Sequence, residues 1–314
     1  MIGPQSIWEW EPALDLFAGG LAAGAFLITA ILYFFGGERF KTTIKLGGWT
    51  GAVGIGLGLL ALLIEVGQPF RAMMVWRSFV NLGSWLAIGA WILLGSLIVF
   101  GLFAIFSTWG PFKDRKSLPR TVLAIIGIPL CAGIVLYTSM LLSTPEFIPF
   151  WHTWFLSALF PISALLTGAA IVLALALVWD KDAAVARLKT YLQISILVLI
   201  VAQGAVLWFY FNSMLGGSEG AMAAANMVTN GELSLLFWVL AIGLGLGVPF
   251  VISIISMALG GRYGSSLIPV QLAGIVLLLV GGFALRYVIL LAGIHEPLVA
   301  PAMDAILNGV TFIP

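Results

Sequence analysis

Four polar side chains lie at a similar expected depth in an otherwise apolar sequence. Asp15 precedes the first long apolar run, and Glu65 nearly ends the second. Tyr137 lies close to the end of the fourth run, and Arg286 close to the end of the eighth. At about 1.5 Å per helical residue, all four come within about 10 Å of one surface. Such groups are costly inside a membrane, which makes them functional candidates, and together they could exchange protons with a bound ligand.

Each of these residues also has a purely structural interpretation. Glu11 and Asp15 could complement the positive end of a helix dipole that begins near Pro12. Glu65 and Arg286 could form an ion pair between helices or extend toward the interface. Tyr137 could be an interfacial aromatic residue. The shared depth of all four residues favours the functional interpretation.

The elements that position these residues follow from composition. Of 314 residues, 61% are hydrophobic and 9% are charged, against about 25% charged in a soluble domain. Taking about 20 apolar residues as one crossing, the sequence predicts an all-α integral membrane protein with eight transmembrane helices. The spans are expected at 16–36, 46–66, 82–106, 121–142, 154–178, 191–212, 235–259 and 267–292. No signal-peptide pattern precedes the first, so we expect it to be retained.

The spans are expected to form two four-helix bundles. The first, 16–142, carries the candidate site and follows an outer N-terminal segment, 1–15. An outer connection, 143–153, leads to the second bundle, 154–292, and an outer tail, 293–314, follows it. The fourth and eighth spans end in similar segments, "LYTSMLLSTPEFIPF" and "LRYVILLAGIHEPLVAP", as a parallel duplication would require.

Basic residues predict the orientation. Eleven of the 14 lysines and arginines lie in the connections after the odd-numbered spans, so the positive-inside rule places both termini on the outer side. Arg71 and Arg77 lie in an outer connection instead, and could anchor at the interface or dock an acidic partner. The outer connection 213–234 could contain a short surface helix.

Several kinds of site are disfavoured. The histidines, His152 and His295, both lie in outer connections, whereas axial haem ligands are needed within spans, so we expect no haem in this chain. One cysteine, Cys131, cannot ligate an iron–sulfur cluster, and no metal or nucleotide motif is present. A net charge of +1 without a basic tail argues against nucleic acid. The glycines of "GGLAAGAF" are typical of close helix packing.

Three stretches resemble the membrane subunit of polysulfide reductase and its NrfD-like relatives. They are "WEWEPALDLFAGGLAAGAFL", "EVGQPFRAMMVWRSFVNLGSWLAIGAWIL" and "LYTSMLLSTPEFIPFWHTWFLSALFPISALLTG". The resemblance implies a haem-free anchor in the prokaryotic cytoplasmic membrane, part of anaerobic respiration. The anchor would exchange electrons between menaquinone or ubiquinone and a four-cluster-type iron–sulfur subunit, which serves a molybdopterin catalytic subunit on the outer face.

The resemblance also implies a quinone site near the outer face. It places Asp15 and Tyr137 at the quinone. Their carboxyl and phenol groups suit proton exchange with it, and we predict supporting roles for Trp10, Glu11, Gly19, Glu65 and Arg286. Where the close polysulfide-reductase pattern has Asn and His, this sequence has Pro12 and Asp15. Arg71 and Arg77 would dock the iron–sulfur partner.

The leading hypothesis is therefore a quinone-linked electron-transfer subunit of a multi-subunit oxidoreductase. Polysulfide, thiosulfate and tetrathionate reductases, formate dehydrogenases and arsenate or selenate reductases all remain open as the complex. A secondary transporter is the alternative that the interrupted seventh span, "LAIGLGLGVPFVISII", would suit. A second alternative is a structural anchor that holds a peripheral enzyme and has no quinone chemistry. The inner half of the spans carries no ladder of carboxylates, so protons are expected to exchange with the outside in an electroneutral step.

Overall fold

The computed structural model describes residues 10–65, 83–109, 117–180, 183–263 and 266–294. This part of the chain is helical, and eight of its helices are long and apolar enough to cross a membrane, which confirms the predicted number. Two short helices accompany them, η1 (Gly37–Phe40) and α8 (Glu219–Thr229). The spanning helices are α1 (Trp10–Phe35), α2 (Lys41–Glu65), α4 (Trp85–Thr108), α5 (Leu118–Ser143), α6 (Trp154–Trp179), α7 (Ala183–Leu215), η3 (Leu236–Gly247) continuing as α9 (Val248–Tyr263), and α10 (Ile268–Leu291).

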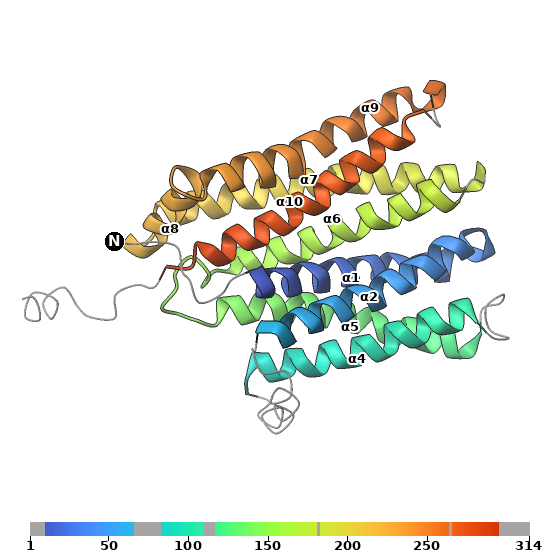
Figure 1. Cartoon of the computed structure of the whole chain (residues 1–314), viewed down its shortest axis with the longest axis horizontal. Coiled ribbons are helices and arrows are strands. Elements are labelled where there is room, and N and C mark those ends of the chain that lie inside the picture. Colours follow the sequence, from blue (N-terminus) through green and yellow to red (C-terminus); the bar gives the residue numbers. More distant parts are fainter. Residues whose placement is uncertain (1–9, 66–82, 110–116, 181–182, 264–265, 295–314) are drawn as a thin grey trace, which may run out of the picture.

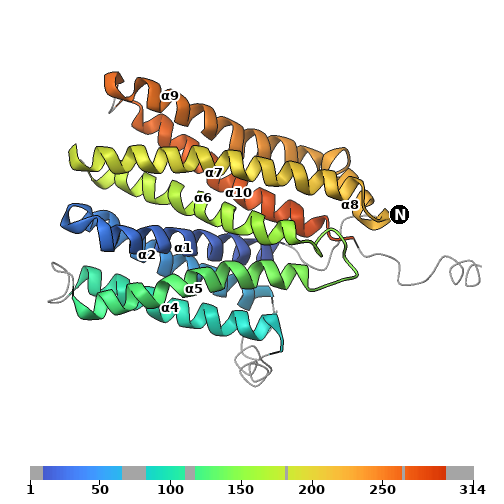
Figure 2. The ribbon, with the colours of Figure 1, turned by 180° about the vertical axis from the view of Figure 1, so that it is seen from behind.

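The spanning helices run side by side and alternate in direction. In Figure 1, α1 begins and α10 ends at the same end of the molecule, where α8 also lies. The view from behind shows the same alignment, with α4 and α5 at one side and α7 and α9 at the other (Figure 2). We call the end at which α1 begins the site end, and the other the basic end, because Arg39, Lys41 and Arg187 lie there.

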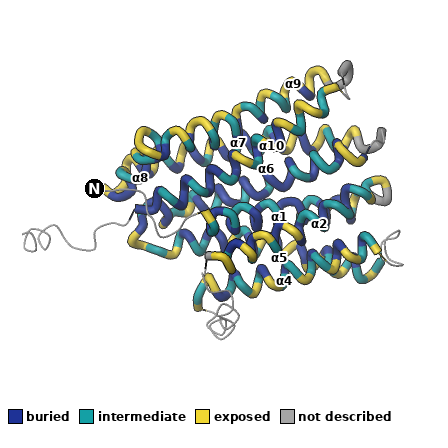
Figure 3. The backbone as a smooth tube through the Cα atoms, viewed as in Figure 1, coloured by how far each residue is buried: buried dark blue, intermediate teal, exposed yellow. Residues whose placement is uncertain are grey.

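Helix α1 occupies the centre of the molecule. It packs against α2, α5, α6 and α10, and 72% of its most apolar window is buried, against 28–44% for α2, α4, α5, α7 and η3–α9. Figure 3 shows the buried residues concentrated along α1 and α6. Because lipid faces most of the outer helices, their large apolar side chains remain exposed to it.

Helices α1 and α6 cross in backbone contact. A Cβ atom on Gly24 would collide with the carbonyl oxygen of Ala164, and one on Gly168 would collide with the backbone of Gly24. Small residues allow such close approach between membrane helices. Gly24 and Gly168 are each the fifteenth residue of a 26-residue helix. The crossing therefore falls at the same position along both helices.

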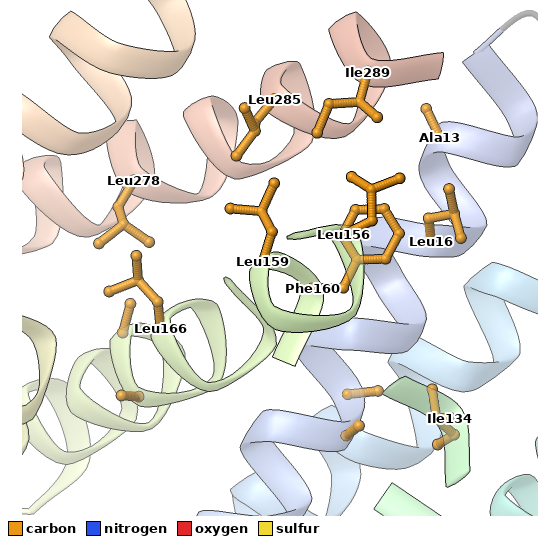
Figure 4. Packing of buried hydrophobic residues seen from close by; sticks show 14 of the residues in the cluster. Ala13, Leu16, Ile134, Leu156, Leu159, Phe160, Leu166, Leu278, Leu285 and Ile289 are labelled. Carbon is orange, nitrogen blue, oxygen red and sulfur yellow. The ribbon is translucent and has the colours of Figure 1, made fainter. Parts of the chain in front are cut away.

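Leucine and phenylalanine side chains fill the space around this crossing. Figure 4 shows Leu159 of α6 facing Leu285 of α10. Leu156 and Phe160 lie between α6 and the first turns of α1, near Leu16. All of these side chains are almost fully buried. Interdigitation of this kind fixes the position of α10 relative to α1.

The seventh span is not a regular α-helix. Residues Leu236–Gly247 form a π-helix, and α-helical geometry resumes at Val248. π-Helical segments are rare. Gly245 lies directly against α10, since a Cβ atom there would come within 2.6 Å of the Gly281 Cα atom. The glycine-rich interruption predicted for this span is therefore a π-helical segment that contacts α10.

The start of the first span and the burial of Trp151 differ from expectation, and one expected short helix is present. Helix α1 begins at Trp10 rather than near residue 16, so Asp15 lies in its second turn and is buried. Trp151, in the connection expected at the outer surface, is also buried, and its Nε1–H donates to the Ile289 carbonyl at 2.7 Å. The short helix expected within 213–234 is α8, which is capped by Ser218.

Polar contacts join the helices at the basic end. The Thr43 hydroxyl donates to the Asp180 carboxylate, and the Lys189 ammonium donates to the Asp180 carbonyl at 3.0 Å. The Tyr33 hydroxyl lies 3.0 Å from that of Thr121, and the Arg120 guanidinium lies 4.8 Å from the centre of the Tyr33 ring. These contacts lie far along the helices from Asp15 and Tyr137.

Candidate functional site

Asp15 and Tyr137 form a buried hydrogen bond between α1 and α5. The Tyr137 hydroxyl donates to Asp15 Oδ2 at 3.2 Å. Only 3% of Asp15 and 2% of Tyr137 are exposed. A buried carboxylate needs hydrogen-bond donors to offset its desolvation, and Tyr137 supplies one. The two residues that the sequence singled out for proton exchange therefore lie in contact.

Glycines on two further helices leave room for this pair. A Cβ atom on Gly58 of α2 would lie 2.6 Å from Asp15 Oδ1. One on Gly89 of α4 would collide with the ring of Tyr137. Four helices thus meet at the pair. Helices α1 and α5 carry its two side chains, and α2 and α4 contribute the glycines that leave space for them.

Arg286 lies in a different environment from Asp15. Its Nη1 donates to Ser163 Oγ at 3.1 Å and to the Gly282 carbonyl at 3.0 Å. Its guanidinium carbon lies 5.6 Å and 5.8 Å from the ring centres of Phe17 and Phe160. Cations are attracted to such aromatic faces. Arg286 therefore links α10 to α6 and α1.

The geometry of α1 explains this separation. Arg286 packs against Gly20, where a Cβ atom would lie 2.9 Å from Nη2. Gly20 is five residues after Asp15, which at 3.6 residues per turn places the two about 140° apart around the helix. Gly19 lies on the Asp15 side and faces Ile134 of α5. The equal depth predicted from the sequence thus does not bring Arg286 to the face of α1 that carries Asp15.

The other predicted site residues fall into two groups. Trp10 is exposed in the first turn of α1, and Glu11 is half-buried beside it. Glu65 ends α2, but its side chain lies outside the described residues, as do Arg71, Arg77 and His295. His152 is exposed, and its Nδ1 contacts the Ser143 carbonyl at 2.7 Å near the end of α5.

Sequence reasoning missed Gly58, Gly89 and Ser163. The two glycines belong to a chain with 37 glycines, so no local signal separates those that make room for Asp15 and Tyr137 from those that pack helices. Ser163 could have been noticed as a hydroxyl within an apolar span, but its partner Arg286 is 123 residues away. Only the tertiary arrangement shows these roles.

The Asp15–Tyr137 pair has the groups needed to handle protons beside an apolar ligand. A phenol can donate a hydrogen bond to a ligand oxygen, and a carboxylate can accept a proton. Such a pair suits proton exchange at the edge of a membrane.

The sequence matches known proteins along most of its length. The family model described as "Polysulphide reductase, NrfD" matches residues 2–297. The C component of the polysulfide reductase of Wolinella succinogenes is 28% identical, with 91% of this chain and 94% of the relative covered. The C component of the selenate reductase of Mesobacillus selenatarsenatis is 24% identical, with 80% of this chain and 67% of the relative covered.

Proposed function

Because the chain belongs to the NrfD polysulphide reductase family, we propose that it is the quinone-interacting membrane subunit of a respiratory oxidoreductase complex. Its similarity to components of a polysulfide reductase and a selenate reductase supports a place in a reductase complex. The subunit would transfer electrons between menaquinone or ubiquinone and an iron–sulfur subunit. That iron–sulfur protein would in turn serve a molybdopterin catalytic subunit.

The observation that carries this proposal is the buried hydrogen bond from Tyr137 to Asp15. A quinone headgroup has two oxygens that each need a hydrogen-bond partner, and its reduction or oxidation moves two protons with two electrons. The phenol of Tyr137 would donate to one oxygen. The carboxylate of Asp15 would accept or return a proton.

Glycines bring the surrounding helices close to the Asp15–Tyr137 pair, beside which the quinone headgroup would bind. Gly58 and Gly89 carry no side chain where the pair lies, and Gly19 faces Ile134 of α5 on the same side of α1. Trp10 and Glu11, in the first turn of α1, would border the entrance, with Glu65 at the end of α2. Arg286 would support the site from the opposite face of α1 by fixing α10 and α6.

The orientation of the molecule supports partners on the outer side. Basic residues gather in the connections opposite the site end, which the positive-inside rule assigns to the cytoplasm. The site end would then face outward, with the iron–sulfur and catalytic subunits docked there. Arg71 and Arg77 would contribute positive charge to that docking surface.

We further propose that quinol protons exchange with the outside. Between the site and the basic end, Thr29 donates to the Ala25 carbonyl and Thr167 to the Ser163 carbonyl. These hydroxyls are satisfied within their own helices and do not link one helix to the next. Electrons and protons leaving on the same side would make the step electroneutral. Membrane potential generated in proteoliposomes by turnover of the complex would contradict this.

Quinol-driven turnover of the assembled complex tests the proposed function. Asp15→Asn and Tyr137→Phe should each lower it by about 100-fold or more, because proton transfer by a positioned group contributes roughly 10²–10⁴-fold. Activity of the catalytic subunit with a water-soluble electron donor should stay unchanged in both variants, because that route bypasses the membrane site.

Matched controls lie at the basic end. Asp180→Asn alters another buried carboxylate, and Tyr33→Phe removes another buried phenol. Both variants should keep full quinol-driven turnover. If the site variants also keep it, the assignment of Asp15 and Tyr137 is wrong. If the purified complex contains no iron–sulfur or molybdenum partner, the proposed type of complex is wrong.

A further inference from the structure

A deep groove runs between α7 and the η3–α9 helix on the lipid-facing side of the molecule. Its volume is about 650 Å³, within the range of about 300–1,000 Å³ that small-molecule sites occupy. The walls are apolar and aromatic, with Leu207, Trp208 and Phe211 on α7 and Phe237 and Phe250 on the opposite side. Neither Asp15 nor Tyr137 contributes to it.

The groove has the length of one membrane leaflet. On α7 it extends from Ile200 to Leu215, which at about 1.5 Å per residue is roughly 22 Å. Half of a hydrocarbon core about 30 Å thick, with one interfacial layer of several Å, has a similar depth. The groove therefore runs from the site end of α7 toward the middle of the bilayer.

The polar residues among those that line the groove gather at its site end. Asn212, Thr229 and Asn230 lie there, and the Asn230 amide donates to the Thr229 hydroxyl at 3.1 Å. Trp238 donates from its indole nitrogen to the Thr229 carbonyl at 2.9 Å. Tryptophan is enriched at the depth of lipid headgroups. A polar end followed by an apolar channel matches a phospholipid.

The floor of the groove is open at Gly204. A Cβ atom added to this residue would meet no protein atom within 4 Å, and Trp208, one turn further on, is 70% exposed. In the first half of the molecule, α2 and α4 pack directly against each other. The corresponding pair, α7 and the seventh span, is instead separated by the groove along this stretch.

We propose that this groove is a binding site for a phospholipid of the leaflet at the site end. One acyl chain lies along α7 over Gly204, and the ester and headgroup region contacts Asn212 and Asn230. The acyl chain takes the place of side-chain packing between α7 and η3.

Photocrosslinking of the assembled complex in nanodiscs tests this proposal. The probe is a phosphatidylethanolamine with a diazirine in its acyl chain, and digestion followed by mass spectrometry locates the adducts. The wild-type protein should be labelled preferentially on residues 200–215 and 236–250. Gly204→Leu should reduce that labelling at least about fivefold, because its side chain fills the space of several methylene groups.

Gly101→Leu is the matched control. Gly101 lies on α4, and a Cβ atom there also meets no protein atom within 4 Å, so the same substitution occurs on a lipid-facing helix away from the groove. Labelling of 200–215 should be unchanged in this variant. The proposal is wrong if wild-type labelling of the groove does not exceed that of α4, or if Gly204→Leu leaves it unchanged. Retention of a quinone or of a partner's helix in the groove would also overturn it.

Discussion

Tyr137 depends on Gly89 for its position against Asp15. The ring lies directly over the backbone of α4, where only a glycine leaves space, and its hydroxyl then reaches Asp15 Oδ2. The geometry of the Asp15–Tyr137 pair therefore depends on a residue with no reactive group. The polar residues could be selected from the sequence because ionisable groups stand out among apolar ones. Gly89 could not, because its role depends on how α4 and α5 meet.

Gly89→Ala should displace the Tyr137 ring and weaken its contact with Asp15. We expect quinol-driven turnover to fall at least tenfold, with a loss in stability of about 1–3 kcal/mol from overpacking. Gly101→Ala on the same helix has open space around it, and should leave both turnover and thermal stability near wild type. Equal turnover in the two variants would show that Tyr137 does not need this position.

Arg286 acts on helix packing. Its guanidinium joins α10 to Ser163 of α6 and lies near two phenylalanine rings. Arg286→Gln should lower the thermal stability of the purified complex, because the charge-assisted hydrogen bond, typically about 1.5–3 kcal/mol, is lost. Ser163→Ala should produce a smaller loss with the arginine retained. If Arg286→Gln kept wild-type stability but abolished turnover, Arg286 would instead take part directly in the reaction with the quinone.

At the scale of helices, hydrophobic length predicted the eight spans well. A stretch of apolar residues must cross the bilayer, so their number follows from composition. The residues at which the helices begin and end are predicted less well from composition, because helices continue beyond the apolar core. Helix α1 begins at Trp10, which buries Asp15 in its second turn. The π-helical geometry of 236–247 also depends on tertiary contacts, since glycine and proline indicate only an interruption.

The crossing of α1 and α6 should be sensitive to added side-chain volume. Gly168→Val would force the two backbones apart at Gly24, and we expect a stability loss of about 3 kcal/mol or more, near the upper end for overpacking. The thermal denaturation of the detergent-purified complex, followed by fluorescence, measures it. Gly101→Val, which meets open space, serves as the control and should change stability little.

For the whole molecule, alternation of the spans and the distribution of basic residues make the orientation testable. Cys131 is buried, so a reactive cysteine can be introduced on either end. Glu219→Cys on α8 should react with a membrane-impermeant maleimide in intact spheroplasts. Arg187→Cys on α7 should react only after permeabilisation. Both positions are exposed, and the opposite labelling pattern would reverse the proposed orientation.

The central claim is that Asp15 and Tyr137 act as one unit on a quinol. A double-mutant cycle on quinol-driven turnover measures this coupling. Each single variant, Asp15→Asn and Tyr137→Phe, should lose most of the turnover, and the double variant should lose little more than the more severe single. Losses that multiply would mean that the two residues act independently. Wild-type turnover in the double variant would contradict the claim altogether.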